Sequence, residues 1–296
     1  MPRPAAYSFA AMLHNISLMT DVLRPPHTSG VSLQMERYLG ADPAVVVSHF
    51  RSRDAKWFVH ADAVAAYASK VLRRLEVHRG NVRELLASLL FQRVAAGFEA
   101  VLLLAERGMH TQGLVQRRSM LEALFVLGAI WQKPQLAEQY LASDDERVLQ
   151  IYKKIKRLPS ELRAALEPEI TPSSLEAKIA ELKGKTSGRK PPTVAEYAEA
   201  ADLLTYYLTD YAFSSEAAHH VAKDLERQIH LDEDGNVNGM GWGPEDVAAS
   251  ELLLNAIDYV LMACFVAEKL FNLDPSTEFE KLHEQTNAFA DSNEAG

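Results

Sequence analysis

The chain has 296 residues, with 31 Lys and Arg, 40 Asp and Glu, and a formal net charge of −9. A content of 48% hydrophobic and 24% charged residues is that of a globular protein and excludes a disordered, collagen-like or coiled-coil chain. The acidic charge argues against broad non-specific binding to nucleic acid or to anionic membranes, but it is compatible with a local basic groove. The single cysteine, Cys264, excludes an internal disulfide and is expected to be a small buried residue.

No membrane span and no leader sequence is expected. The longest apolar run, over residues 94–105, is interrupted by Glu99 and is too short to cross a bilayer. The first residues lack the apolar core of a signal peptide. A cytoplasmic protein is therefore expected.

The first half of the chain predicts helices in succession. Short helices are expected over residues 5–23 and 32–38, the first closed by Pro25 and Pro26. Apolar residues at helical spacing predict longer helices over 61–78, 81–107, 111–131 and 134–157. Asn81 is expected to cap the second of these and Gly108 to end it, so that two long helices form an antiparallel hairpin.

The second half is more interrupted. Prolines shorten the helices after residue 158, an amphipathic segment covers 174–182, and a basic loop covers 183–190. Thr193 and Glu196 have the spacing of a capping box, which predicts a helix towards residue 227, continuous or broken once. An Asp-Gly turn predicts a β-hairpin over 229–240, and Pro244 suits the first turn of a last helix ending near Asn272.

These elements predict an all-α fold: an antiparallel helical bundle with one small β-hairpin near residues 229–240. Residues 1–50 are expected to be an N-terminal helical cap or arm, residues 51–275 the bundle, and residues 276–296 a polar C-terminal tail. A polar residue within the apolar face of such a bundle needs a partner, because removing it from water is costly. The candidate site residues are chosen on this ground.

Arg118 and Glu122 stand four residues apart on an apolar stripe of the helix over 111–131. A charge in such a place requires an opposite charge or a ligand. The order Arg before Glu is the weaker one for an exposed helical pair. The two residues are therefore interpreted as a buried ion pair, with a part in a functional site or an exposed pair as the alternatives.

Tyr211, Ser215 and His219 recur every fourth residue on the later helix. Three hydrogen-bonding side chains thus align where the pattern would otherwise place apolar residues. Histidine is the usual residue for proton transfer near neutral pH, so His219 is the candidate acid or base. Glu99, on the helix over 81–107, is interpreted as a residue at the rim of the bundle, with a place in the same interior as the alternative.

Other motifs are weak. Residues 232–243 resemble a calcium loop but lack its glycine and its final glutamate. Basic stretches over 153–157 and 183–190 could hold phosphate, but a solvated surface is the preferred interpretation. No metal-ligand motif, phosphate loop or nucleophile elbow is present, so no cofactor and no metal are expected.

The segments 108–123 and 211–219 resemble an uncharacterised bacterial family, the domain-of-unknown-function family number 5677. Its pattern is Arg-x-x-x-Glu on one helix and Tyr-x-x-x-Ser-x-x-x-His on a later one, here Arg118 and Glu122, then Tyr211, Ser215 and His219. The resemblance covers about residues 55–272 and implies an all-helical fold without an established activity. The helical build is similar to that of HEPN-type ribonucleases, which serve in toxin and phage-defence systems.

The chain departs from the HEPN pattern, in which the arginine and histidine share one helix end. Arg74 and His78 have that spacing, but they are interpreted as the end of a solvated helix. Three interpretations follow: an interaction or structural module, a metal-independent ribonuclease, or a pocket enzyme or small-ligand binder that uses Glu99, Glu122 and His219, with or without a metal. The first is preferred. The expected partner is a second copy of the chain, another protein or RNA. Association with a membrane is not expected.

Overall fold

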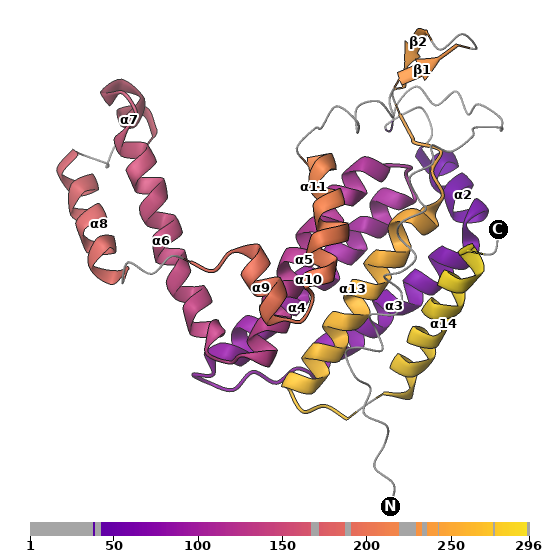
Figure 1. Ribbon diagram of the computed structural model, residues 1–296, viewed down its shortest axis with the longest axis horizontal. Coiled ribbons are helices and arrows are strands. Elements are labelled where there is room, and N and C mark those ends of the chain that lie inside the picture. Colours follow the sequence, from indigo (N-terminus) through magenta and orange to yellow (C-terminus); the bar gives the residue numbers. More distant parts are fainter. Residues whose placement is uncertain are drawn as a thin grey trace, which may run out of the picture.

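The computed structural model describes residues 38, 43–166, 172–186, 191–218, 229–232, 236–241, 243–274 and 276–294. Within them the chain is a helical bundle with one small hairpin, so the predicted all-α fold is confirmed (Figure 1). In the hairpin, β1 (Ile229–Leu231) pairs antiparallel with β2 (Val237–Met240), with Ile229 opposite Met240. Apart from Tyr38, the helices expected over 5–23 and 32–38 lie outside the described residues.

The core consists of α4 (Val82–Ala105), α5 (His110–Gln132) and α13 (Ala249–Leu270), which pack against one another. The predicted hairpin of α4 and α5 is confirmed, and the Asn81 side chain accepts a hydrogen bond from the Glu84 amide as the predicted cap. Gly108 ends α4 at a φ of +65°, and a Cβ there would lie 2.6 Å from the Phe50 ring. A larger residue would therefore disturb the connection between the two helices.

Three helices surround this core. These are α2 (Pro43–Arg53), α3 (Ala55–Arg74) and α14 (Thr277–Glu294), with α3 packed on α4 and α13. Residues 277–294 of the expected polar tail form α14, which buries Phe279, Leu282 and Thr286 against its neighbours. The tail is amphipathic because its few apolar residues recur at helical spacing.

The last core helix begins later than predicted. Its first residue is Ala249, so Pro244 lies in the preceding loop rather than in the first turn. The reason is that residues 244–245 pack against the α4–α5 connection, where the Glu245 amide donates to the Gly108 carbonyl at 2.8 Å. Tertiary packing overrides the local helix signal here.

Two of the described helices are long and apolar enough to cross a membrane by length and composition alone, α4 and α13. In the bundle, 50% of the most apolar stretch of α4 and 72% of that of α13 are buried by other helices. The stripe of α4 that includes Leu85, Leu89 and Leu103 is the exposed side, because the opposite side, with Phe91 and Phe98, faces the core. The helical spacing of the apolar residues predicted this helix but did not show which of its faces is buried.

An arm leaves the bundle after α5. It consists of α6 (Leu136–Lys156), α7 (Ser160–Leu166) and α8 (Pro172–Lys185) and stands apart from the bundle helices (Figure 1). Ala137 and Tyr140 at its base pack on the bundle, and the Tyr140 ring meets the Tyr197 ring at 6.0 Å. Further out, α6 and α8 share a separate small core of Leu149, Leu175, Ile179 and Leu182.

The chain returns to the bundle through a broken helix. It comprises α9 (Val194–Ala200), α10 (Leu204–Tyr206), a five-residue π-helical turn η2 (Tyr207–Tyr211) and α11 (Ala212–Ala218). The predicted capping box of Thr193 and Glu196 is present. The break follows Ala201, where Asp202 adopts a φ of +61°. The turn η2 holds an extra residue, and such turns are frequent at functional sites.

Candidate functional site

The structure brings Arg118, Glu122 and Tyr211 together across α5 and η2. The Arg118 guanidinium donates from Nη2 to the Tyr211 hydroxyl at 2.8 Å, and that hydroxyl donates to Glu122 Oε1 at 2.9 Å. Arg118 Nη2 lies 3.2 Å from Glu122 Oε1, so the predicted ion pair is present. The guanidinium also covers the Tyr211 ring, 4.9 Å from its centroid. We call these three residues the Arg118 cluster.

The Arg118 cluster is half-buried rather than sealed in the core. The Arg118 side chain is 24% exposed and that of Glu122 is 42% exposed. Tyr211 stacks on Tyr207 with ring centroids 5.1 Å apart. Burial raises the pKa of the Tyr211 hydroxyl, and the bond from Arg118 offsets part of that rise. The ion pair therefore lies at the edge of the core, and the interpretation of a pair buried within it does not hold.

Ser215 and His219 contribute differently from Tyr211. The Ser215 hydroxyl donates to the Tyr211 carbonyl at 2.6 Å, one turn back along its own helix. It is therefore engaged with the backbone and does not join the Arg118 cluster. His219 lies outside the described residues. The neighbouring Ser214 is fully buried instead.

A second network, next to the first, is sealed within the bundle. Arg117 donates from Nη2 to Asp210 at 2.5 Å and from Nη1 to the Glu251 carbonyl at 2.9 Å. The Tyr259 hydroxyl and the Asn255 amide also donate to Asp210. The side chains of Arg117 and Asp210 are 3% and 0% exposed. We call these four residues, Arg117, Asp210, Asn255 and Tyr259, the Arg117 network.

Tyr206 and Asp258 extend this polar interior. The Tyr206 hydroxyl donates to Asp258 Oδ2 at 2.8 Å, and the Tyr206 and Tyr259 rings meet edge to face. Burial raises the pKa of the Asp258 carboxyl to about 6, and the Tyr206 bond offsets part of the rise. Burial also raises the pKa of the Tyr259 hydroxyl well above its usual value. The Asp258 carboxyl and the Tyr259 hydroxyl are both too deeply buried for a substrate to reach them.

The sequence carried a signal for some of this network. Asp258 is an acidic residue within an otherwise apolar stretch of α13, which marks a buried charge that needs a partner. Asp210 gave no such signal, because the π turn interrupts the 3.6-residue period on which helical stripes depend. Arg117 was passed over in favour of Arg118, its neighbour one position along α5.

The remaining candidates do not join either cluster. Glu99 is exposed on α4, which agrees with a place at the rim of the bundle and not with one in its interior. Arg74 lies 3.5 Å from Glu268, whereas His78 lies 2.9 Å from Glu84, so the two residues have different partners. Among the described residues no group of three His, Cys, Asp or Glu side chains could hold a metal ion.

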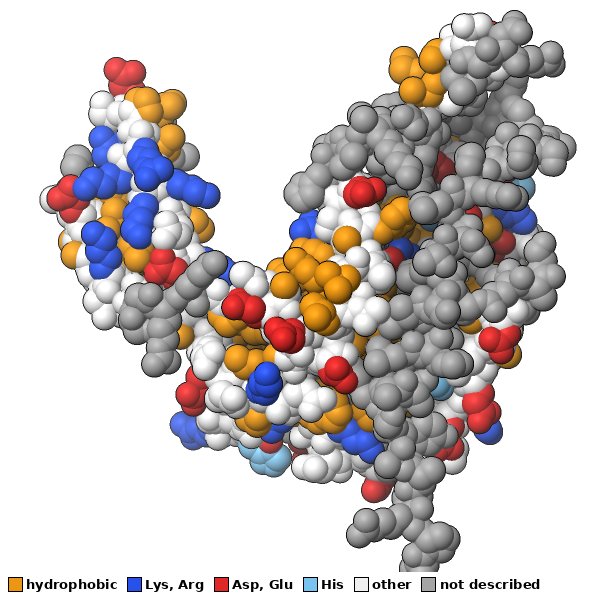
Figure 2. Space-filling view, viewed as in Figure 1, with side chains coloured by type: hydrophobic (Ala, Val, Ile, Leu, Met, Phe, Trp, Pro, Cys, Tyr) orange, Lys and Arg blue, Asp and Glu red, His pale blue; other side chains and the backbone are white. Residues whose placement is uncertain are grey.

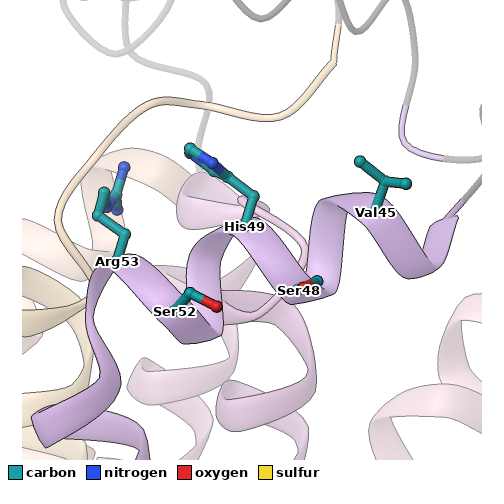
Figure 3. Close-up of a pocket in the computed structure, with 5 residues that line it drawn as sticks. All are labelled: Val45, Ser48, His49, Ser52 and Arg53. Atoms are coloured by element: carbon teal, nitrogen blue, oxygen red, sulfur yellow. The ribbon is translucent and has the colours of Figure 1, made fainter.

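A surface depression lies on α2, away from the residues predicted from sequence. Val45, Ser48, His49, Ser52 and Arg53 line it, and the side chains of Val45, His49 and Arg53 rise from one side of the helix (Figure 3). Arg53 is engaged there by Asp54 and Asp246. None of the Arg118 cluster contributes to this depression.

Comparison with known proteins gives one match. The model of a family of unknown function (DUF5677) matches residues 84–237. This range includes most of α4, all of α5 and the arm, the Arg118 cluster, and Arg117 and Asp210 of the Arg117 network. No curated protein matches the chain. No solved structure matches it either.

Proposed function

We propose that this chain, which belongs to the family of unknown function DUF5677, is an interaction module rather than a catalyst. The observation that carries the proposal is the pairing of the predicted site residues with one another. Arg118 and Glu122 meet at Tyr211, and Ser215 bonds to the Tyr211 carbonyl. Side chains engaged in this way support the register of two helices.

The Arg117 network supports the same interpretation. It joins three elements, α5, η2 and α13, through one carboxylate with several donors. A buried polar network whose members are paired specifies one arrangement of the helices around it. The bundle is thus a rigid scaffold. Its internal polar contacts explain the family's Arg and Tyr positions without a catalytic role.

The arm is the part of this scaffold that is available to bind a partner. Beyond its base, α6 packs mainly on α8, and among the described residues of the arm their shared core has four buried apolar side chains. An element that adds so little to the main core is not needed to stabilise it. We propose that the arm contacts another macromolecule in the cytoplasm, while a second copy of the chain remains a candidate partner for other surfaces.

The test is a double-mutant cycle on Arg118→Ala and Tyr211→Phe, measured by urea unfolding. The second change removes the hydroxyl and keeps the ring under the guanidinium. A structural role predicts that each change costs about 1 kcal/mol. The cycle should give a coupling of about 0.5 kcal/mol or more, because the two groups are in contact. Additive or stabilising changes would contradict the proposal, since residues retained for chemistry often reduce stability.

A second candidate is a HEPN-like, metal-independent ribonuclease of a toxin or phage-defence system. The observation in its favour is that Arg118 is 24% exposed beside a tyrosine hydroxyl, where it could meet a phosphate. His219 would be the acid or base. Cleavage of RNA by the purified chain, lost in Arg118→Ala and His219→Ala, would support this candidate against the first.

A further inference from the structure

The charges of the chain are unevenly distributed. Residues 147–190 contain eleven Lys and Arg and five Asp and Glu, a net charge of +6 in a chain whose total is −9. The rest of the protein therefore carries −15. Most of this basic segment is the outer part of the arm, where blue side chains gather on the face in view (Figure 2).

Several of these basic residues are not neutralised by neighbours. Lys156 pairs with Glu176, while Lys178 and Lys185 share Glu181. Within the described part of the chain no ion pair involves four others, which we call the basic face of the arm: Lys153, Lys154, Arg157 and Lys183. A surface that concentrates unpaired cations attracts an anionic partner.

The length of α6 keeps this face away from the acidic bundle. Lys153 is 18 positions into α6, which places it about 25 Å along the helix axis at 1.5 Å per residue. Charges separated by more than about 8 Å are largely screened at physiological ionic strength. The negative bundle therefore cancels little of the field around the basic face.

We propose that the basic face of the arm binds a nucleic-acid strand through its phosphodiester backbone. This rests on the proposed function, in which the arm contacts the partner. Basic residues three and four positions apart on a helix stand about 5–6 Å from each other. A nucleic-acid strand carries one phosphate per about 3.4 Å of its axis, so several phosphates can be met at once.

An anionic membrane fits this surface less well. A helix that lies in a membrane presents an apolar face to the lipid. Four large apolar residues of the arm, Leu149, Leu175, Ile179 and Leu182, are instead buried between α6 and α8. The exposed ones, Leu141, Ile151 and Leu162, are spread over α6 and α7, with the first two ten positions apart on α6, so they do not form a continuous apolar face. The basic face is therefore suited to a partner that offers regular charge rather than hydrocarbon.

The test measures binding of a fluorescent 20-nucleotide RNA by anisotropy with the full chain at several salt concentrations. The test variant changes Lys153, Lys154, Arg157 and Lys183 to Gln. The control variant changes four exposed basic residues of the bundle and its connections, Arg73, Arg79, Arg93 and Lys133, to Gln and has the same net charge. A third variant changes Lys153, Lys154 and Lys183 of the arm to Arg and keeps the positive charge of the basic face. It shows whether changing these side chains without removing their charge disturbs the fold.

The arm variant should lose at least about tenfold in affinity at 0.1 M salt, and the control less than about threefold. Four phosphate contacts to a single strand predict a log–log salt slope of about −3, or about a 50-fold loss between 50 and 200 mM salt. The arginine variant should bind like the parent. Equal losses in the arm and control variants, or no binding at 50 mM salt, would overturn the proposal.

Other probes separate this proposal from the proposed function. Tighter, arm-dependent binding of a 20-residue oligoglutamate or of anionic phosphatidylserine vesicles would overturn the nucleic-acid assignment and leave the interaction module standing. Shortening of the RNA in an Arg118-dependent manner would contradict the interaction module but not the contact through the arm. A DNA strand of the same sequence shows whether the sugar matters.

Discussion

Two neighbouring arginines of α5 have different roles because a helix turns about 100° per residue. Arg117 is sealed with Asp210, whereas Arg118 remains partly exposed beside Glu122 and Tyr211. The apolar stripe of the sequence pointed to Arg118. Both faces of this helix are lined with apolar residues, so periodicity alone could not decide which arginine is buried.

The two arginines should differ in their contribution to stability. Arg117→Met leaves the Asp210 charge buried without its cation and should cost about 3–5 kcal/mol of unfolding free energy. Arg118→Met removes a half-exposed pair and should cost about 1 kcal/mol or less. Urea denaturation of both variants makes the comparison.

The double variant Arg117→Met with Asp210→Leu is the matched control. It removes both charges, so it should recover part of the loss, while the buried Tyr259 hydroxyl, left without its acceptor, keeps the variant less stable than the parent. Similar losses in the two single variants would show that our assignment of the buried partner is wrong.

At the scale of elements, the sequence correctly predicted the features that depend on residues close together in the chain. The Asn81 cap, the Thr193 capping box and the pairing of β1 with β2 are such features, and each is present. The start of α13 and the π turn η2 depend on packing between distant segments. No window of sequence contains that information, so these two features were missed.

The docking of α14 should depend on pH. His60 of α3 bonds to Thr286 of α14 at 2.9 Å, and its ring meets Phe289 edge to face. Burial lowers the pKa of His60, and also that of His283, which stacks on Phe279. The undocked state therefore takes up protons first, and the contribution of these residues to docking is lost as pH falls below about 6.5.

Hydrogen exchange of α14 peptides at pH 5.5 and 7.5, corrected for intrinsic rates, measures this effect. We expect α14 to lose protection at the lower pH while α4 and α5 do not. His60→Gln should remove much of the difference. Asp258 acts in the opposite direction, since its raised pKa of about 6 favours the fold as pH falls. Uniform loss of protection across the bundle would contradict local release of α14.

For the whole molecule, the sequence predicted an all-α bundle but not its division into a bundle and an arm. Prolines after residue 158 indicated short helices, yet nothing local shows that α6 leaves the bundle. The same holds for the site. Tyr211, Arg118 and Glu122 were found from their spacing and do converge, whereas the Arg117 network required three distant segments to be placed together.

The arm should open independently of the bundle. Leu182→Ala removes one of the four residues of the arm's small core, and such a truncation costs about 2–5 kcal/mol where the residue is buried. We expect limited proteolysis to cut α8 much faster in this variant, while the thermal midpoint of the bundle changes little. Leu124→Ala, in the main core, is the control and should lower that midpoint. A lowered midpoint in Leu182→Ala would show that the arm and bundle unfold together.

The Arg117 network also sets an order of events during synthesis. Arg117 is 93 residues before Asp210 and 134 before Glu251, whose carbonyl it also reaches. At about 5–20 residues per second, a ribosome takes about 7 to 27 s to make the later segment. Asp210 is made about 5 to 19 s after Arg117, so until then the arginine of the α4–α5 hairpin has no carboxylate partner. The nascent bundle therefore cannot close around this charge until α13 has been made.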